Sequence, residues 1–411
     1  MDKLLRNHAE SIVSAVISAV KPDAAVRRAL SGAAFPGRIV LVAAGKAAWQ
    51  MAKAAYDSLG DRIDRGIVVT KYDHVMGPIG NFILCEAGHP IPDENSFLGT
   101  QKALELVEGL TEQDTVLFLL SGGGSALFEK PLIPGQQLQD ITGQLLACGA
   151  DIVEINTIRK RLSAVKGGRF AESCLPAQVF SIVLSDILGD PLDMIASGPA
   201  CPDSSTCADA LAIAEKYQLR LSEDVWALLQ QETPKTLTNV TTHITGSVRE
   251  LCAAAAITCA DLGYETVILT DMLSCQAKEA GSFLASILRT HAGSGKKLAF
   301  IAGGETVVKL TGKGKGGRNQ ELALSAAAGI EGLPGAAIFS VGSDGTDGPT
   351  EAAGGYTDYE TAIALRQQGL SIPAVLQEND AYHALLACNG LIFTGPTGTN
   401  VNDVAVALLN G

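Results

Sequence analysis

The chain has 411 residues, of which 47% are hydrophobic and 18% are charged, and its formal net charge at pH 7 is -13. This length exceeds what one hydrophobic core usually organises, so we expect a globular protein of two domains. The acidic balance argues against a general nucleic-acid or membrane-surface binder, because phosphate backbones and anionic lipids would be repelled, although local basic loops stay possible.

Short apolar runs rich in Val, Ile, Leu and Phe predict buried parallel strands in the first half of the chain. They are residues 38–44, 66–70, 82–86, 115–120 and 179–184. Stretches with helical spacing lie between them, as at 46–59 and 94–109. This alternation is typical of a doubly wound α/β sheet.

After residue 200 the alternation starts again and predicts a second α/β domain. Its helices are expected near 206–217, 248–262, 276–290 and 319–328, and its strands at 265–270, 298–302 and 336–342. The polar segment 231–240 contains a proline and separates the two patterns, which is typical of a linker. We therefore expect domains at 1–236 and 237–411.

Neither the first residues nor the cysteines indicate export. Residues 1–8 contain no apolar run that leads to a cleavage site, and no apolar stretch reaches the roughly 18 to 20 residues needed to cross a bilayer. The nine cysteines are scattered singly without a C-x-x-C pair, so neither a disulfide framework nor a zinc ribbon is indicated. We expect a cytoplasmic protein.

Ligands of open parallel sheets collect where strands end, so the loops there are the first candidates for a site. Gly45 and Lys46 follow the strand 38–44, where the ammonium group could lie beside a phosphate. The alternative is an ordinary solvated lysine in the first turn of a helix. No G-x-x-x-x-G-K-[ST] pattern is present, which excludes a P-loop.

A second loop, after strand 115–120, contains three consecutive glycines whose amides could converge on an anion. The loop consists of Ser121, Gly122, Gly123, Gly124 and Ser125. The alternative is a flexible crossing turn. An esterase elbow is excluded, because no G-x-S-x-G surrounds Ser125.

Carboxylates follow two further strands and suit Mg2+, which prefers oxygen ligands. Asp186 and Asp190 follow the strand 179–184, and Asp344 follows the strand 336–342. The alternatives are a helix N-cap for Asp186 or Asp190 and an Asx-turn for Asp344.

The loop 312–317 formally matches the dinucleotide fingerprint G-x-G-x-x-G. Against a dinucleotide site, two lysines crowd the loop and Arg318 follows it directly, and Asp344 lies 27 residues after Gly317 rather than near 20. Phosphate binding by Lys315, Gly316 and Gly317 fits the loop better.

Three further residues are weaker candidates. His89 could donate to a carboxylate, but a histidine before proline is more often a loop-packing residue. Lys166 and Arg169 could extend a basic pocket or could simply be solvated. The six histidines show no zinc-binding spacing.

Several longer motifs occur together in one known family. They are AAGKAA at 43–48, GHPIPDE at 88–94, SGGGSAL at 121–127, NTIRKRLSAVKGGR at 156–169, SDILGDPLDMIASGP at 185–199, GGET at 303–306, GKGGRNQELAL at 314–324 and GSDGTDGPT at 342–350. Through these motifs the chain resembles the class II glycerate 2-kinases, the MOFRL family, from about residue 5 to its end.

The resemblance implies an N-terminal Rossmann-like domain, a smaller C-terminal α/β domain and an active site in the cleft between them. It also implies Mg2+-dependent transfer of a phosphoryl group from ATP to the 2-hydroxyl of D-glycerate, giving 2-phosphoglycerate. The essential lysine and arginine of the family match Lys46 and Arg318. We assign Mg2+ to Asp186, Asp190 and Asp344, and one of these carboxylates, Asp186 in the first place, to the substrate hydroxyl.

Two other functions stay open, and so does the oligomeric state. An NAD(P)H-dependent hydroxypyruvate reductase would use the loop 312–317 as a dinucleotide site. A non-catalytic sensor of a hydroxy acid or nucleotide would keep the glycine loops without needing Lys46 and Arg318 together. A homodimer is compatible with the sequence, which does not determine the oligomeric state.

Overall fold

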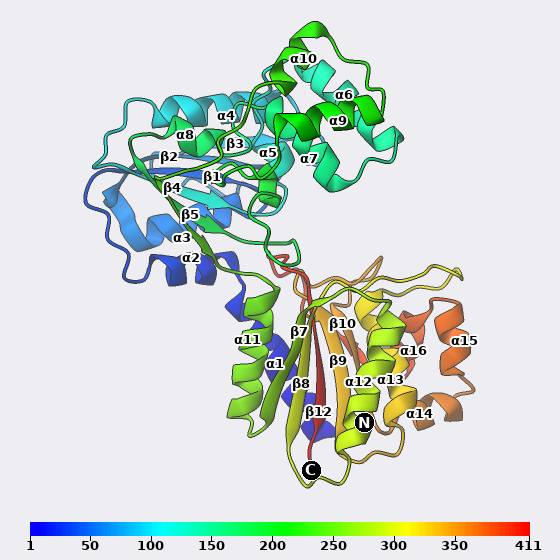
Figure 1. Ribbon diagram of the computed structural model, residues 1–411. Coiled ribbons are helices and arrows are strands. Elements are labelled where there is room, and N and C mark those ends of the chain that lie inside the picture. The colour runs from blue at the N-terminus through cyan, green and yellow to red at the C-terminus, as the bar shows by residue number, and fades with distance from the viewer. The chain divides into compact units, whose positions relative to one another are not determined.

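The computed structural model describes residues 1–411, and the chain divides into two compact units. We call Pro22–Thr245 the Rossmann-like unit, and Met1–Lys21 together with Gly246–Gly411 the C-terminal unit (Figure 1). The predicted boundary between residues 236 and 237 therefore differs from the structure in two places. No helix is both long and apolar enough to span a membrane.

The first difference concerns the N-terminal helix α1 (Lys3–Ala19), which belongs to the C-terminal unit. Its apolar face packs on α11 (Val248–Asp261) and on the sheet of that unit, so that Leu5 and Ile12 share a core with Phe339. An amphipathic helix is stabilised by whichever apolar surface covers it, and sequence order does not reveal which surface that is.

The second difference concerns the predicted linker at 231–240, which is fixed within the Rossmann-like unit. The Thr233 hydroxyl donates to Asp203 at 2.7 Å, and the Asn239 amide donates to the carbonyl oxygens of Ala171 and Ala177 at 2.9 and 3.1 Å. A sixth strand, β6 (Val240–Ile244), follows directly. The linker prediction was wrong because the polar side chains of this segment bind buried groups instead of water.

All six strands of the Rossmann-like unit run parallel, in the order β3-β2-β1-β4-β5-β6. The first five are β1 (Ile39–Ala44), β2 (Ile63–Lys71), β3 (Ile83–Ala87), β4 (Thr115–Leu120) and β5 (Gln178–Val183). They confirm the five predicted strands. The order reverses between the neighbours β1 and β4, so the loops that follow these two strands lie at the switch point where such sheets bind ligands.

Helices cover both faces of this sheet (Figure 1). On one face lie α2 (Pro22–Leu30) and α3 (Ala48–Leu59), and on the other lie α4 (Glu94–Val107) and α8 (Arg169–Ser173). The short α5 (Gly124–Leu127) follows β4. Four more helices share an apolar core of their own, namely α6 (Gly135–Ala147), α7 (Ile152–Arg161), α9 (Cys207–Lys216) and α10 (Glu223–Leu229). Short 3-10 helices are Gly60–Arg62 and Ile195–Ser197.

The sheet of the C-terminal unit is mixed, in the order β11-β10-β9-β12-β8-β7. Its strands are β7 (Glu265–Leu273), β8 (Leu298–Gly304), β9 (Ala336–Gly342), β10 (Gly354–Asp358), β11 (Leu391–Ile392) and β12 (Asp403–Leu409). The strand β12 lies between β8 and β9 and is antiparallel to both. Both units are therefore α/β, as the sequence predicts.

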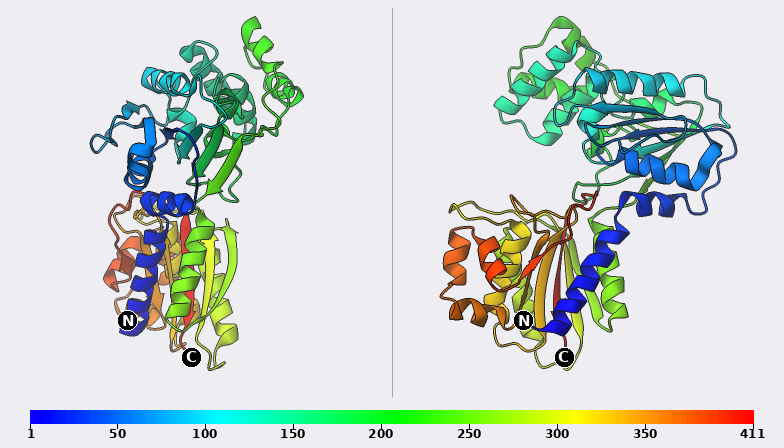
Figure 2. Two further views of the ribbon diagram at one scale, coloured as in Figure 1. Left: turned by 90° about the vertical axis from the view of Figure 1, so that its left-hand side faces the viewer. Right: turned by 180° about the vertical axis from the view of Figure 1, so that it is seen from behind.

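Two layers of helices enclose this second sheet (Figures 1 and 2). The helices α1 and α11 pack on one face, while α12 (Ala277–His291) and α13 (Arg318–Ile330) pack on the other. Three short helices pack beyond α13, namely α14 (Thr361–Gln367), α15 (Ile372–Gln377) and α16 (Ala381–Ala387).

Candidate active site

The loops after β1 and β4 are bonded to one another. The Lys46 amide donates to the carbonyl oxygen of Gly122 at 2.9 Å, and the Ala47 amide donates to the Ser121 hydroxyl at 3.0 Å. Gly45 has φ +123°, and a Cβ atom there would lie 2.2 Å from the Ser121 Oγ atom. Only glycine fits at position 45, because the backbone there lies so close to Ser121. This close contact brings the predicted lysine, Lys46, beside the predicted glycine loop.

Three side chains surround the glycine loop. A Cβ atom on Gly123 would lie 3.0 Å from Cδ2 of His89 and 3.1 Å from Cγ of Lys46. A Cβ atom on Gly122 would lie 2.3 Å from Oδ2 of Asp186. The structure therefore brings Lys46, Asp186 and the glycine loop together in one unit. These close neighbours favour the interpretation of the loop as a ligand cradle over a flexible crossing turn, and both stay predictions.

His89 is a member of this site that the sequence only weakly indicated. Burial lowers its pKa, and the nearby Lys46 ammonium group lowers it further. At neutral pH the ring is therefore uncharged, and it offers one donor and one acceptor instead of a second positive charge. Its signal in the sequence is the GHPIPDE motif, whose role as a neighbour of the glycine loop becomes visible only in the fold.

The carboxylates after β5 differ in their surroundings. Asp193 accepts from the Ser204 hydroxyl at 2.8 Å and lies 3.5 Å from the Lys160 ammonium group. Asp190 has φ +53°, and its buried Oδ1 atom has no hydrogen-bond partner. No helix begins at Asp186 or Asp190, so the N-cap alternative is wrong for both. An unpartnered carboxylate oxygen suits a hard cation such as Mg2+.

In the C-terminal unit, Arg318 is the first residue of α13 and is held by two carboxylates. Its Nε and Nη2 atoms donate to Asp403 at 2.5 and 3.0 Å, and its Nη1 atom donates to Glu305 at 2.9 Å. Burial alone would lower the pKa of Arg318, but the bond to Asp403 raises it above its ordinary value. The guanidinium group is therefore permanently charged and oriented, and 34% of the side chain is exposed.

Two aspartates support the start of α13. Asp347 accepts from the amides of Asn319 and Gln320 at 3.2 and 2.9 Å, and burial raises its pKa to about 6. Asp344 accepts from the Thr346 amide at 3.0 Å, which is the Asx-turn expected as the alternative to a metal ligand. A turn of this kind uses one oxygen and leaves the metal prediction for Asp344 untested.

The loop 312–317 contacts residues just before and at the start of α16. The Lys315 amide donates to Asp380 at 2.9 Å, and its ammonium group lies 4.2 Å from the centre of the Tyr382 ring. The loop does not follow a strand directly, since β8 ends at Gly304, and β8 and β9 are separated by the antiparallel β12. A dinucleotide fingerprint needs a preceding strand and a parallel neighbour, so this topology removes the support for a dinucleotide site.

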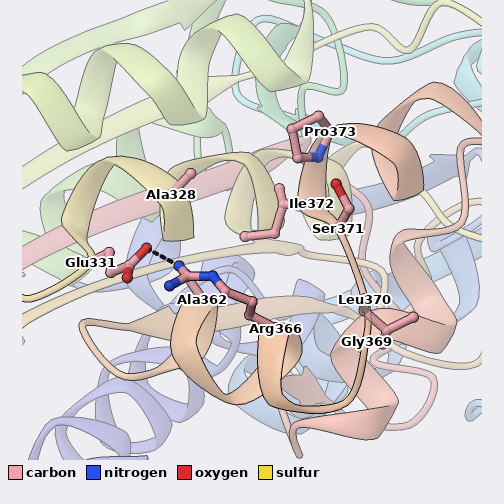
Figure 3. Close-up of a pocket in the computed structure, with 9 residues that line it drawn as sticks. All are labelled: Ala328, Glu331, Ala362, Arg366, Gly369, Leu370, Ser371, Ile372 and Pro373. Carbon is pink, nitrogen blue, oxygen red and sulfur yellow. Dashed lines mark hydrogen bonds and ion pairs between the residues drawn. The ribbon is translucent and has the colours of Figure 1, made fainter.

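Neither of two cavities in the C-terminal unit contains a predicted site residue. One, of 340 Å³, lies among α13, α14 and the start of α15, where Arg366 and Glu331 form an ion pair of 2.6 Å (Figure 3). The other, of 430 Å³, lies between α1 and residues 392–397. The candidate site is therefore defined by loops and their side chains.

A sheet with the Rossmann order that carries a glycine loop, a lysine and a carboxylate at its switch point defines an α/β protein with a candidate ligand site at that point. Comparison with known proteins agrees with this class. Residues 8–230 match a family described as a domain of unknown function, DUF4147, and residues 298–403 match the MOFRL family.

Several relatives that match along most of the chain are named glycerate kinases, and two from Agrobacterium vitis, 40% and 37% identical over 91% of this chain, are named putative hydroxypyruvate reductases. The D-glycerate 2-kinase of Thermotoga maritima is 53% identical over 98% of both chains, and the glycerate 2-kinase of Pyrococcus horikoshii is 41% identical over 91% of this chain and 88% of that one. The crystal structure of a Thermotoga maritima glycerate kinase has a TM-score of 0.94 at 52% identity, covering 99% of this chain and all of that one. The chain belongs to the MOFRL family of class II glycerate 2-kinases.

Proposed function

We propose that this chain is an ATP-dependent glycerate 2-kinase, which transfers the γ-phosphoryl group of ATP to the 2-hydroxyl of D-glycerate and releases 2-phosphoglycerate and ADP. The observation that carries the proposal is the junction of Lys46, the glycine loop and Asp186 at the switch point of the sheet. The identity of 53% to a D-glycerate 2-kinase along nearly the whole chain supports the choice of substrate.

The groups around the glycine loop match what phosphoryl transfer needs, which is positioning and charge stabilisation. Within the Rossmann-like unit, the amides of Gly123 and Ser125 donate to no backbone carbonyl oxygen, and they are proposed to donate to phosphate oxygens of ATP. The Lys46 ammonium group adds positive charge to the same place. Asp186 beside Gly122 is the proposed acceptor of the substrate hydroxyl proton.

The C-terminal unit is proposed to supply a second cation and a second glycine loop for the reaction. Arg318 is proposed to stabilise negative charge that develops on the transferred group, because its guanidinium group is held rigidly by Asp403 and Glu305 and remains partly exposed. Lys315, Gly316 and Gly317 are proposed to contact the phosphates of ATP.

Asp186 and Asp190 are the proposed Mg2+ ligands of the Rossmann-like unit, and Asp344 is the proposed ligand of the C-terminal unit. The unpartnered Oδ1 atom of Asp190 supports this assignment. Mg2+ usually takes one or two carboxylates together with phosphate oxygens and water, so two carboxylates on one loop are sufficient. When bound, the ion neutralises charge on the phosphates of ATP.

The test is an assay of the purified protein with D-glycerate, ATP and Mg2+, with product identification by phosphorus NMR. The proposal predicts 2-phosphoglycerate and ADP. A parallel reaction contains hydroxypyruvate and NADH. Oxidation of NADH with ATP left intact would replace the kinase by the reductase, and binding of both ligands without turnover would favour the sensor.

Two further proposals concern the cell and the assembly. All nine cysteines are free thiols in the structure, which supports a cytoplasmic location. A homodimer is the proposed assembly, and light scattering of the purified protein at several concentrations tests it. A mass of 42.6 kDa at every concentration would contradict the dimer.

A further inference from the structure

A fully buried ammonium group lies behind the glycine loop. The Nζ atom of Lys166 donates to the carbonyl oxygens of Ser125 and Phe128 at 2.9 and 3.1 Å, and lies 3.5 Å from the Glu129 carboxylate. The side chains of Lys166 and Glu129 are both 0% exposed. Lys166 therefore cannot contact a ligand, and the expectation that it extends a basic pocket or is solvated was wrong.

A second cation binds the same loop residue. The Nη2 atom of Arg159 donates to the Ser125 carbonyl oxygen at 2.9 Å and to Glu129 at 3.3 Å. One carbonyl oxygen, that of the last residue of the glycine loop, thus accepts from two charged donors. Burying two cations against one carboxylate is unfavourable for stability compared with apolar packing, which suggests that this arrangement serves the loop.

The Ser125 carbonyl oxygen is well placed to set the conformation of the loop. The amides of Ala126 and Leu127 both donate to the Gly123 carbonyl oxygen at 3.2 Å, so the turn 123–127 is one hydrogen-bonded unit. Fixing the carbonyl end of this turn from inside the protein also fixes the direction of the amides at its other end. A glycine-rich segment has few side chains of its own with which to hold such a direction.

We propose that Lys166, together with Arg159 and Glu129, is a positioning residue that holds the glycine loop 121–125 in the conformation that binds the phosphates of the nucleotide. It acts through the Ser125 carbonyl oxygen. The inference rests on the proposed function only in so far as this loop binds ATP.

Arg169 offers a matched control on the same segment. Its Nη1 atom donates to three carbonyl oxygens, those of Lys160, Arg161 and Ser163, at 3.2, 3.2 and 2.7 Å. It is a partly buried cation with the same kind of partners, but none of them lies in the glycine loop. Replacing it removes a similar set of hydrogen bonds without releasing Ser125.

The experiment compares Lys166→Met, Lys166→Arg and Arg169→Met in the full chain. Calorimetry measures the Kd of ADP, kinetics give KM for ATP and for D-glycerate, and thermal unfolding gives Tm. We expect Lys166→Met to raise the Kd of ADP and KM for ATP about tenfold, the equivalent of one lost hydrogen bond to a charged group, with KM for D-glycerate nearly unchanged. Lys166→Arg should restore most of the ADP affinity, and Arg169→Met should lower Tm with little change in that affinity.

The inference is overturned if Lys166→Met and Arg169→Met change the Kd of ADP equally, because the role of Lys166 would then be structural. If Lys166→Met does not fold, Arg159→Met replaces it, and an unchanged Kd of ADP in that variant overturns the inference. Failure of the proposed function gives a different result: the unaltered protein would bind ADP in a Lys166-dependent way without phosphorylating D-glycerate.

Discussion

The backbone amide of Lys46 donates to the carbonyl oxygen of Gly122 across 2.9 Å and thereby joins the loop after β1 to the loop after β4. Because β1 and β4 are neighbours at the reversal of strand order, this bond lies where an open parallel sheet binds its ligand. The proposed chemistry of the Rossmann-like unit depends on that junction.

Gly45→Ala should disrupt the junction. The new Cβ atom would lie 2.2 Å from the Ser121 hydroxyl oxygen at a φ of +123°, so we expect the free energy of unfolding to fall by about 1 to 3 kcal/mol and kinase activity to be largely lost. Gly143→Ala in α6 is the control, since nothing lies within 4 Å of its Cβ position. In a denaturant titration, Gly143→Ala should be as stable as the unaltered protein or more stable. Retained activity in Gly45→Ala would contradict the importance of the contact between Gly45 and Ser121.

Lys46→Met should leave the fold intact and lower kcat by about a hundredfold or more, because the charge that we propose to stabilise the transferred phosphoryl group is lost. Lys53→Met removes a lysine of α3 that forms an exposed ion pair with Asp57 at 2.5 Å, and should leave kcat unchanged. Steady-state kinetics and circular dichroism of both variants check this. Equal kcat values in the two variants would remove Lys46 from the chemistry.

Arg318→Lys should be nearly as inactive as Arg318→Ala. A lysine cannot reproduce the two-pronged bond to Asp403, so the charge would lose its orientation, and we expect kcat to fall by about a hundredfold or more in both variants. Arg366→Lys, at an exposed ion pair with Glu331, is the matched control. Near-normal turnover of Arg318→Lys would show that only a positive charge is needed there.

Asp190→Asn should raise the Mg2+ concentration that gives half-maximal activity by about tenfold, because the buried Oδ1 atom would lose its negative charge. Asp193→Asn is the comparison, since Asp193 is already bonded to Ser204 and lies near Lys160. That variant should lower Tm more than it alters the Mg2+ requirement. A titration in which Asp190→Asn keeps the unaltered Mg2+ dependence would exclude Asp190 as a ligand.

Lys166 should make stability depend on pH in alkaline solution. Burial lowers its pKa from 10.5 to about 8, while Glu129 opposes the lowering and Arg159 adds to it. Between pH 8 and 10.5 the unfolded chain therefore binds the proton that the folded chain has lost, so this group makes the folded state relatively more stable as pH rises. With a folded-state pKa of about 8, this group raises the free energy of unfolding by roughly 3 kcal/mol across that pH window.

The measurement is the free energy of unfolding of the unaltered protein and of Lys166→Met at several pH values from 7 to 10.5. The free energy of unfolding of the unaltered protein minus that of Lys166→Met should increase as pH rises. A constant difference would mean that Lys166 keeps an ordinary pKa in its buried position.

Much of the Rossmann-like unit could be predicted because its central strands are buried on both faces. Every residue of β1 and β4 is buried, so each strand appears in the sequence as an uninterrupted apolar run. The strand β6 has the sequence VTTHI and is only partly buried at the sheet edge, and the sequence predicted no strand there. Edge strands lack the pattern on which the prediction depends.

The candidate site could be predicted one loop at a time. Lys46, the glycine loop and Asp186 were found because each follows a strand. His89 was underestimated, since nothing local shows that its ring lies against Gly123 and Lys46. Lys166 was expected to extend a basic pocket or to be solvated, whereas the fold buries it against carbonyl oxygens.

The sequence by itself determined the α/β class, the buried strands, the loops that follow them and, through its motifs, the family. These features depend on local periodicity and on residues close together in the chain. Only the tertiary structure decided that α1 belongs to the C-terminal unit, that β12 separates β8 from β9, and that two cations share the Ser125 carbonyl oxygen. Such partners are far apart in sequence, and they are selected by which apolar faces and buried polar groups satisfy one another in the folded chain.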